Sequence, residues 1–223
     1  MIKALVFDLD DTLYPSDDYV ESGFRAVARY AGEKYGIDPE HAYAYMKILY
    51  TRYGEREVFS RTVCYFDLDT SSIIELTSVF RNHAPVISLY QNYRRILEDL
   101  GTVFSLAILA DGDPEVQERK LKALRIRKLF KNIIFTGKFD EGKWKPNPFC
   151  FNLMARVLRL PPHELVYVAD NPLTDFLGAK KAGYYTLRVL TGPMAAKKVP
   201  MEFEAHFRIR DITKIHECLD EQF

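Results

Sequence analysis

Residues 1–15 read MIKALVFDLDDTLYP, a short apolar run that ends in a cluster of acids. The run carries one lysine and is too short and too acidic for a signal peptide, so we interpret it as a buried strand. Strands that are covered on both faces of a parallel sheet are near-continuous apolar runs of this kind. Asp8 and Asp10 therefore directly follow the first strand of a predicted sheet.

Similar apolar runs follow along the chain, and each also ends at a polar residue. They are VFSLAIL before Asp111, NIIF before Thr136, LVYVA before Asp170 and YYTLRVL before Thr191. Helical patterns separate these runs, and several open with an acid or amide followed by proline. The predicted helices are Tyr90–Leu100, Asp113-Pro114 through Leu124, Asn147-Pro148 through Leu158, and Pro172 to near Gly183. This alternation predicts an α/β fold with a doubly wound, Rossmann-like parallel sheet.

The stretch after the first strand breaks the alternation. From Pro15 to Ser88 apolar residues recur at helical spacing, as in Val20, Phe24 and Val27, and strand signals are almost absent. We expect roughly four helices in this stretch, forming a small domain inserted into the sheet domain. The predicted domains are a core domain, 1–14 and 89–223, and a helical cap domain, 15–88.

Composition limits the partners of the chain. Its 223 residues hold 31 basic and 31 acidic side chains, so the formal net charge is zero and no long-range field draws the molecule to nucleic acid or to an anionic membrane. No apolar run approaches the ~18 residues of a membrane helix. The three cysteines lack metal-binding spacing and indicate a reduced compartment. We expect a cytoplasmic protein with neither nucleic-acid nor membrane partners; no heptad or apolar stripe indicates its oligomeric state.

Several acids lie where open α/β sheets bind their ligands, outside the carboxyl ends of the strands. Asp8 and Asp10 follow the first strand, Asp111 the second and Asp170 the fourth. Converging carboxylates repel one another unless a cation lies among them, and oxygen ligands without His or Cys indicate a hard ion such as Mg²⁺. Lys145 follows the third strand. A divalent cation and a lysine facing carboxylates suit phosphoryl transfer, which depends mostly on positioning and charge neutralisation.

Three motifs resemble those of the haloacid dehalogenase superfamily, in the same order and strand context. Phe7–Leu13 (FDLDDTL) resembles its opening DxDxT motif, Lys145-Pro146 its lysine motif, and Asp170–Asp175 (DNPLTD) its acidic motif, with GAKKAG following at Gly178–Gly183. The helical insert occupies the place where one class of these enzymes carries a cap domain. The resemblance implies a magnesium-dependent phosphoric monoester hydrolase whose partner is a small phosphorylated metabolite.

The resemblance also implies roles for the matching residues. Asp8 would attack the phosphorus and form an aspartyl-phosphate. Asp10 would protonate the leaving oxygen and then activate a water molecule. The implied metal ligands are Asp8, the backbone carbonyl of Asp10, Asp170 and, indirectly or through a bound water, Asp175. The implied substrate-binding residues are Thr12, which steadies the loop, Asp111 and Gly112 through their backbone N–H groups, and Lys145, which is also catalytic.

One position departs from the family pattern. Ala110 stands at the end of the second strand, where the family usually has Ser or Thr to hold a phosphoryl oxygen. A lost hydrogen bond to a charged group costs about 1.5–3 kcal/mol, which corresponds to roughly one to two decades in rate. We therefore expect modest activity, with backbone N–H groups as the remaining donors and the Asp111 carboxylate pointing away.

Alternatives stay open at this point. Asp175 could cap the next helix instead of serving the site, and Trp144 could either pack its loop or contact substrate. A catalytically weak or inactive binding module is the main alternative function, supported by Ala110 alone. A 2-haloacid dehalogenase or a phosphomutase is less favoured. Dehalogenases resemble a form that lacks the acid at the position of Asp10 and needs no metal, so Asp10 and Asp170 argue against that function.

Overall fold

A six-stranded sheet forms the centre of the computed structural model, which describes residues 1–222. Its strands are all parallel and lie in the order β3–β2–β1–β4–β5–β6. Their bounds are β1 Ala4–Phe7, β2 Ser105–Ala110, β3 Asn132–Phe135, β4 Leu165–Ala169, β5 Tyr185–Val189 and β6 Phe207–Ile209. The predicted fold class is confirmed. Sequence analysis missed β6, because three residues do not make a recognisable apolar run.

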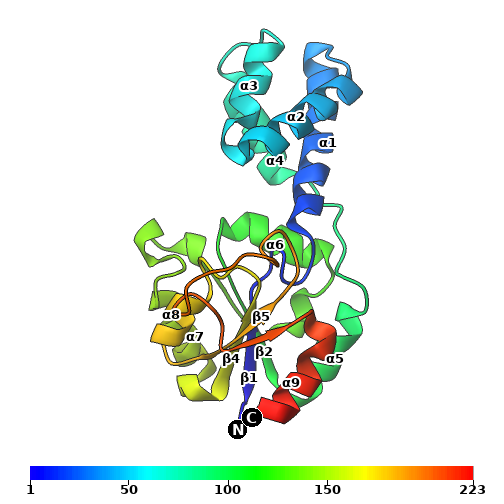
Figure 1. Ribbon diagram of the computed structural model, residues 1–223. Helices are drawn as coiled ribbons and strands as arrows, with labels where there is room; N and C mark the ends of the chain where they lie inside the picture. The colour runs from blue at the N-terminus through cyan, green and yellow to red at the C-terminus, as the bar shows by residue number, and fades with distance from the viewer. Residues whose placement is uncertain (223) are drawn as a thin grey trace. The chain divides into compact units, whose positions relative to one another are not determined.

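Helices cover both faces of this sheet. Figure 1 shows α7 (Phe149–Leu158) and α8 (Phe176–Lys181) on one side of it, with α5 (Tyr93–Val103) and α9 (Ile215–Gln222) on the other. A further helix of this part of the chain, α6, spans Pro114–Ala123. The arrangement is the doubly wound one expected for parallel strands, which need a crossover to return to the same end of the sheet.

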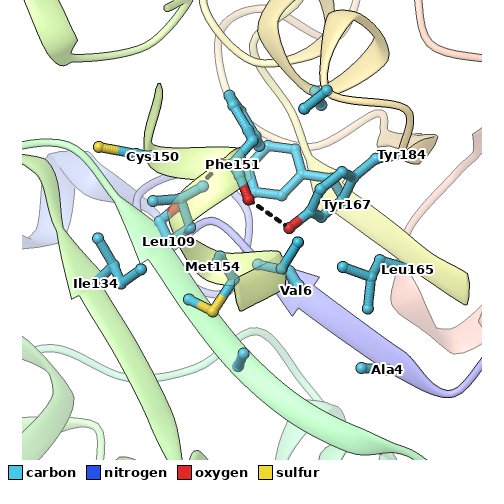
Figure 2. Close-up of a cluster of buried hydrophobic side chains, with 14 of the residues drawn as sticks. Ala4, Val6, Leu109, Ile134, Cys150, Phe151, Met154, Leu165, Tyr167 and Tyr184 are labelled. Atoms are coloured by element: carbon cyan, nitrogen blue, oxygen red, sulfur yellow. Dashed lines mark hydrogen bonds between the residues drawn. The ribbon is translucent and has the colours of Figure 1, made fainter. Parts of the chain in front are cut away.

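A buried cluster joins the sheet to α7 and α8 (Figure 2). Phe151 of α7 packs edge-on against Tyr167 of β4, with ring centroids 4.9 Å apart, and also against Tyr184. Val6 of β1 and Leu109 of β2 belong to the same cluster. This packing fixes the central strands whose carboxyl ends carry the acids.

Two predicted helices begin later than expected. The chain turns at Asn171, whose backbone and side-chain oxygens accept hydrogen bonds from the N–H groups of Asp175 and Leu173, so α8 begins at Phe176 rather than at Pro172. Tyr90 donates its N–H to Leu13, and Asn92 has a left-handed backbone (φ 69°), so α5 begins only at Tyr93. Both starts depend on hydrogen bonds that the apolar pattern does not reveal, one within the turn at Asn171 and one to the distant Leu13.

A helical unit is inserted between β1 and β2, as predicted. The chain divides into two compact units: residues 1–16 with the chain from 88 onward, called here the sheet unit, and residues 17–87, called the helical unit. The inserted helices are α1 Ser16–Tyr35, α2 Pro39–Tyr53, α3 Val58–Tyr65 and α4 Ser72–Asn82. They share an apolar core of their own that includes Phe24, Met46 and Leu76. None of the helices in residues 1–222 combines the length and the apolar character that a membrane crossing requires.

Candidate active site

The register of the sheet brings the predicted acids together. Phe7 of β1 lies opposite Ile108 of β2 and Val168 of β4, so these three strands end at nearly the same level. The strand order also reverses between β1 and β4, and such a switch point leaves a crevice at the carboxyl ends of the strands. Asp8 and Asp170 are the residues that follow β1 and β4 at this place.

Asp8, Asp170 and Asp175 form a buried carboxylate cluster. Their side chains each offer an oxygen within 4.8 Å of the others, and the residues are only 7%, 3% and 1% exposed. Asp175 comes from the turn before α8. Among residues 1–222 this is the single group of three or more acids, histidines and cysteines close enough to hold a metal ion.

Lys145 supplies the positive charge within the cluster. Its Nζ lies 2.8 Å from Oδ1 of Asp8 and 2.7 Å from Oδ1 of Asp175, and its side chain is buried. It also donates to the hydroxyl of Tyr167 at 3.1 Å, and that hydroxyl donates to the backbone carbonyl of Leu109. Lys145 is thereby fixed from three sides.

The single positive charge of Lys145 does not balance the negative charges of three buried carboxylates. Burial raises the pKa of Asp8 to about 7, although Lys145 acts to lower it. Burial, together with the charges of Asp175 and Asp8, raises the pKa of Asp170 to about 8. The uncompensated charge and the all-oxygen donor set fit a hard divalent cation such as Mg²⁺.

The carboxylate of Asp10 points to different partners. Oδ1 accepts from Nζ of Lys120 at 2.7 Å and from the hydroxyl of Tyr14, and Oδ2 accepts from Nε2 of Gln117 at 3.0 Å. Burial alone would raise the pKa of Asp10, but the Lys120 charge and these hydrogen bonds outweigh it and lower the pKa. The Asp10 side chain is not part of the buried carboxylate cluster, so any metal contact of this residue falls to its backbone.

The other predicted substrate-binding residues line the same edge of the sheet. Thr12 is buried and donates its hydroxyl to Oδ1 of Asp170 at 3.1 Å. The Asp111 carboxylate accepts from the hydroxyl of Thr136 at 2.7 Å and from the N–H of Lys145 at 3.3 Å. Gly112 has a backbone φ of 111°, a conformation that favours glycine.

The contacts of Asp175 and Trp144 bear on the two possible roles of each residue. Asp175 occupies the position before α8 but makes no capping hydrogen bond with its side chain. Its carboxylate instead accepts from Lys145 and from the N–H of Asn171 at 3.0 Å. Trp144 donates its ring N–H to the carbonyl of Phe139 at 3.0 Å, which is a contact within its own loop. The geometry thus favours a site role for Asp175 and a packing role for Trp144.

Gln117, Lys120, Tyr14 and Tyr167 were missed by sequence analysis. A weak signal existed for three of them. Gln117 and Lys120 are one helical turn apart in the helix that begins at Pro114, and Tyr167 brings a hydroxyl into an otherwise apolar run. Nothing in the sequence alone tells whether these polar groups point toward the acids.

Comparisons with known proteins identify the family of the chain. A family model for haloacid dehalogenase-like hydrolases matches residues 5–189. A protein named glyceraldehyde 3-phosphate phosphatase, from Methanopyrus kandleri, is 30% identical over 201 residues, which covers 86% of this chain and 85% of that protein. A protein of the same name from Methanocaldococcus jannaschii is 30% identical over 203 residues, covering 86% of each.

Solved structures show the same fold. A structure described as 2-haloacid dehalogenase from Pseudomonas syringae pv. Tomato has a TM-score of 0.70 and 20% identity, and the match covers 100% of both chains. At 20% sequence identity, this likeness shows the fold alone. Together with the family model and the two relatives, it shows that the chain belongs to the haloacid dehalogenase-like hydrolases.

Proposed function

We propose that this haloacid dehalogenase-type phosphatase hydrolyses small phosphorylated metabolites, with Asp8 as the nucleophile and Mg²⁺ as the cofactor. The observation that carries the proposal is the buried cluster of Asp8, Asp170 and Asp175 around Lys145. Sugar phosphates, and glyceraldehyde 3-phosphate in particular, are the first substrates to test, because two relatives that cover most of the chain are named for that substrate.

The proposed reaction has two steps. In the first, a carboxylate oxygen of Asp8 attacks the phosphorus, the bond from phosphorus to the leaving oxygen breaks, and the protonated form of Asp10 gives that oxygen its proton. In the second, water attacks the aspartyl-phosphate, Asp10 takes a proton from the water, and Asp8 is released with inorganic phosphate. Splitting the displacement in this way retains the phosphoryl group on the protein between the two steps.

The charged groups around Asp8 support both steps. Lys145, 2.8 Å from Asp8, would hold the nucleophile and offset the charge of the phosphoryl oxygens. Asp8, Asp170 and the backbone carbonyl of Asp10 would bind Mg²⁺, with Asp175 contributing through a bound water. The bound ion would neutralise charge on the carboxylates and on the phosphoryl group.

Phosphate binding would depend on backbone groups. The N–H groups of Asp111 and Gly112 follow β2, and the Asp111 carboxylate is turned toward Thr136, so it leaves those donors available to an anion. Ala110 contributes no hydroxyl there. We further propose that residues 15–88 act as a cap domain that excludes bulk water and large phosphorylated molecules.

The direct test is a phosphate-release assay on a panel of sugar phosphates and p-nitrophenyl phosphate, with Mg²⁺ and with EDTA. We expect activity that requires Mg²⁺ and disappears in Asp8→Asn. Asp113→Asn is the matched control, because it makes the same change at an exposed acid and keeps the helix-capping oxygen.

Other results would point to the alternatives. Halide release from 2-haloacids without metal would indicate a dehalogenase. No turnover across the panel by folded protein that binds Mg²⁺ would contradict the phosphatase proposal and favour the binding module.

A further inference from the structure

Gln117 and Lys120 contact Asp10, and neither has an assigned role. We propose that these two residues of α6 are positioning residues, which hold the Asp10 carboxylate in place for proton transfer. The inference rests on the proposed function, because it takes Asp10 as the group that exchanges protons with the leaving oxygen and with water.

Each oxygen of the Asp10 carboxylate has a donor on α6. Nζ of Lys120 lies 2.7 Å from Oδ1, and Nε2 of Gln117 lies 3.0 Å from Oδ2. Because the two donors bind different oxygens, they fix the plane of the carboxylate as well as its position. A single hydrogen bond would leave rotation about the last side-chain bond free.

Both donors are themselves buried. Gln117 is 4% exposed and Lys120 is 7% exposed, and they lie one helical turn apart on the face of α6 that also buries Leu121. Placing a lysine ammonium in the interior costs free energy unless an opposite charge compensates it. Lys122 on the same helix, by contrast, leaves 69% of its side chain in solvent. The burial of Lys120 therefore directs its charge to Asp10.

Gln117 links Asp10 to a second loop of the site. Its amide nitrogen has two hydrogens, and it donates one to Asp10 and one to the backbone carbonyl of Asp111. Both partners are acceptors, so the orientation of the amide is determined. Gln117 thus connects Asp111, the residue after β2, with Asp10.

Correct placement matters more for Asp10 than for an ordinary surface acid. Proton transfer needs a heavy-atom distance within hydrogen-bond reach, and misplacement by about 1 Å costs on the order of 10²-fold in rate. Tyr14 donates to Oδ1 of Asp10, the oxygen that Lys120 also contacts. Loss of Gln117 therefore removes a donor to a different oxygen, Oδ2.

The test compares leaving groups. Lys120→Met and Gln117→Met remove the donors while retaining similar volume, and Lys122→Met is the matched control on an exposed position of α6. For an alkyl phosphate such as glycerol phosphate, whose leaving oxygen needs a proton, we expect kcat/KM to fall by about 10–100-fold. For p-nitrophenyl phosphate, whose leaving group departs without a proton, we expect a fall of less than about 3-fold.

The contrast between the two substrates separates positioning from damage to the fold. A purely structural role would lower both kcat/KM values equally, and this result would overturn the inference, as would a Lys120→Met variant indistinguishable from Lys122→Met. Lys120→Arg, which keeps the charge, should recover part of the alkyl phosphate rate. Circular dichroism and the melting temperature establish that each variant is folded.

The outcome also distinguishes this inference from the proposed function. If wild-type protein is active, Asp8→Asn is not, and the α6 variants behave like the control, then only the positioning role fails. If wild-type protein hydrolyses no phosphate ester, or if Asp8→Asn remains active, then both fail together.

Discussion

At the scale of single residues, Lys145 connects Asp8 with Asp175. It binds Asp8, which follows β1, and Asp175, which precedes α8, and Tyr167 of β4 accepts a further hydrogen bond from it. Burial alone would lower the pKa of Lys145, but the charges of Asp175 and Asp8 keep it well above the ordinary value. Lys145 therefore stays protonated at any pH at which the protein would work, and its role is that of a fixed charge.

Ala110 is a position at which we expect a substitution to raise the rate. In Ala110→Ser we expect kcat/KM for a phosphate ester to rise by about tenfold, because a hydroxyl at the end of β2 would add a hydrogen bond to a charged oxygen. The measurement is steady-state kinetics with Mg²⁺. Ala107→Ser, a buried change in the same strand but away from its carboxyl end, is the control and should give no gain. Equal rates in wild type and Ala110→Ser would show that backbone donors already suffice.

The site residues differ in how far the sequence reveals them. Asp8, Asp170 and Lys145 belong to motifs, and each follows a strand whose carboxyl end meets the others at one edge of the sheet, so their proximity can be predicted. Gln117 and Tyr167 stand in no motif. Their roles depend on which way a helix face or a strand side chain points. For Tyr167 that direction depends on packing against Phe151 of α7.

At the scale of elements, α6 provides two contacts to Asp10, and its start is well defined. Pro114 occupies its first turn, and Oδ1 of Asp113 accepts from the N–H groups of Glu115 and Val116 at 2.9 and 3.1 Å. This cap satisfies donors that have no partner inside the helix. Acid followed by proline is a signal that predicts this start correctly. The later starts of α5 and α8 depend on contacts with Leu13 and within the 171–175 turn, which leave no such signal.

The cap of α6 gives a prediction on stability. We expect Asp113→Ala to lower the free energy of unfolding by about 0.5–2 kcal/mol, because two helix N–H groups lose their acceptor. Urea unfolding followed by the fluorescence of Trp144, the single tryptophan of the chain, measures this loss in the sheet unit. Asp113→Asn keeps a capping oxygen and should stay close to wild type. A loss of the same size in both variants would assign the effect to charge and not to capping.

At the scale of the whole molecule, most strands and the helical insert can be predicted from the sequence. Five of the six strands are visible as apolar runs, because a parallel strand buried on both faces needs such a run. The inserted helices are visible because a different periodicity replaces the strand signal between β1 and β2. The short edge strand β6 could not be predicted, since its three residues gain their structure from pairing with β5. The family model, which spans 5–189, ends before β6.

We expect metal binding and pH to act together on the stability of the protein. The pKa values of Asp8 and Asp170 are raised from 3.8 to about 7 and about 8, so the metal-free folded protein binds protons more tightly than the unfolded chain. The contribution of these two carboxyl groups to stability is therefore fully present below their unfolded pKa and is lost as the pH rises through the folded values. Mg²⁺ needs the deprotonated carboxylates, so its binding should release protons and strengthen with pH over the same range.

We accordingly expect Mg²⁺ to raise the melting temperature more at pH 8 than at pH 6, compared with EDTA at each pH. Thermal unfolding at a fixed ionic strength measures the gain, and calorimetry in two buffers of different ionisation enthalpy counts the released protons. Asp170→Asn should lose most of this gain in melting temperature, because it removes the carboxylate that has the higher pKa of Asp8 and Asp170. Asp113→Asn should retain the gain. A gain that is the same at pH 6 and pH 8, or that survives in Asp170→Asn, would place the ion outside the buried carboxylate cluster. The same experiment thus tests, without any substrate, whether the charge imbalance around Lys145 is what the metal ion corrects.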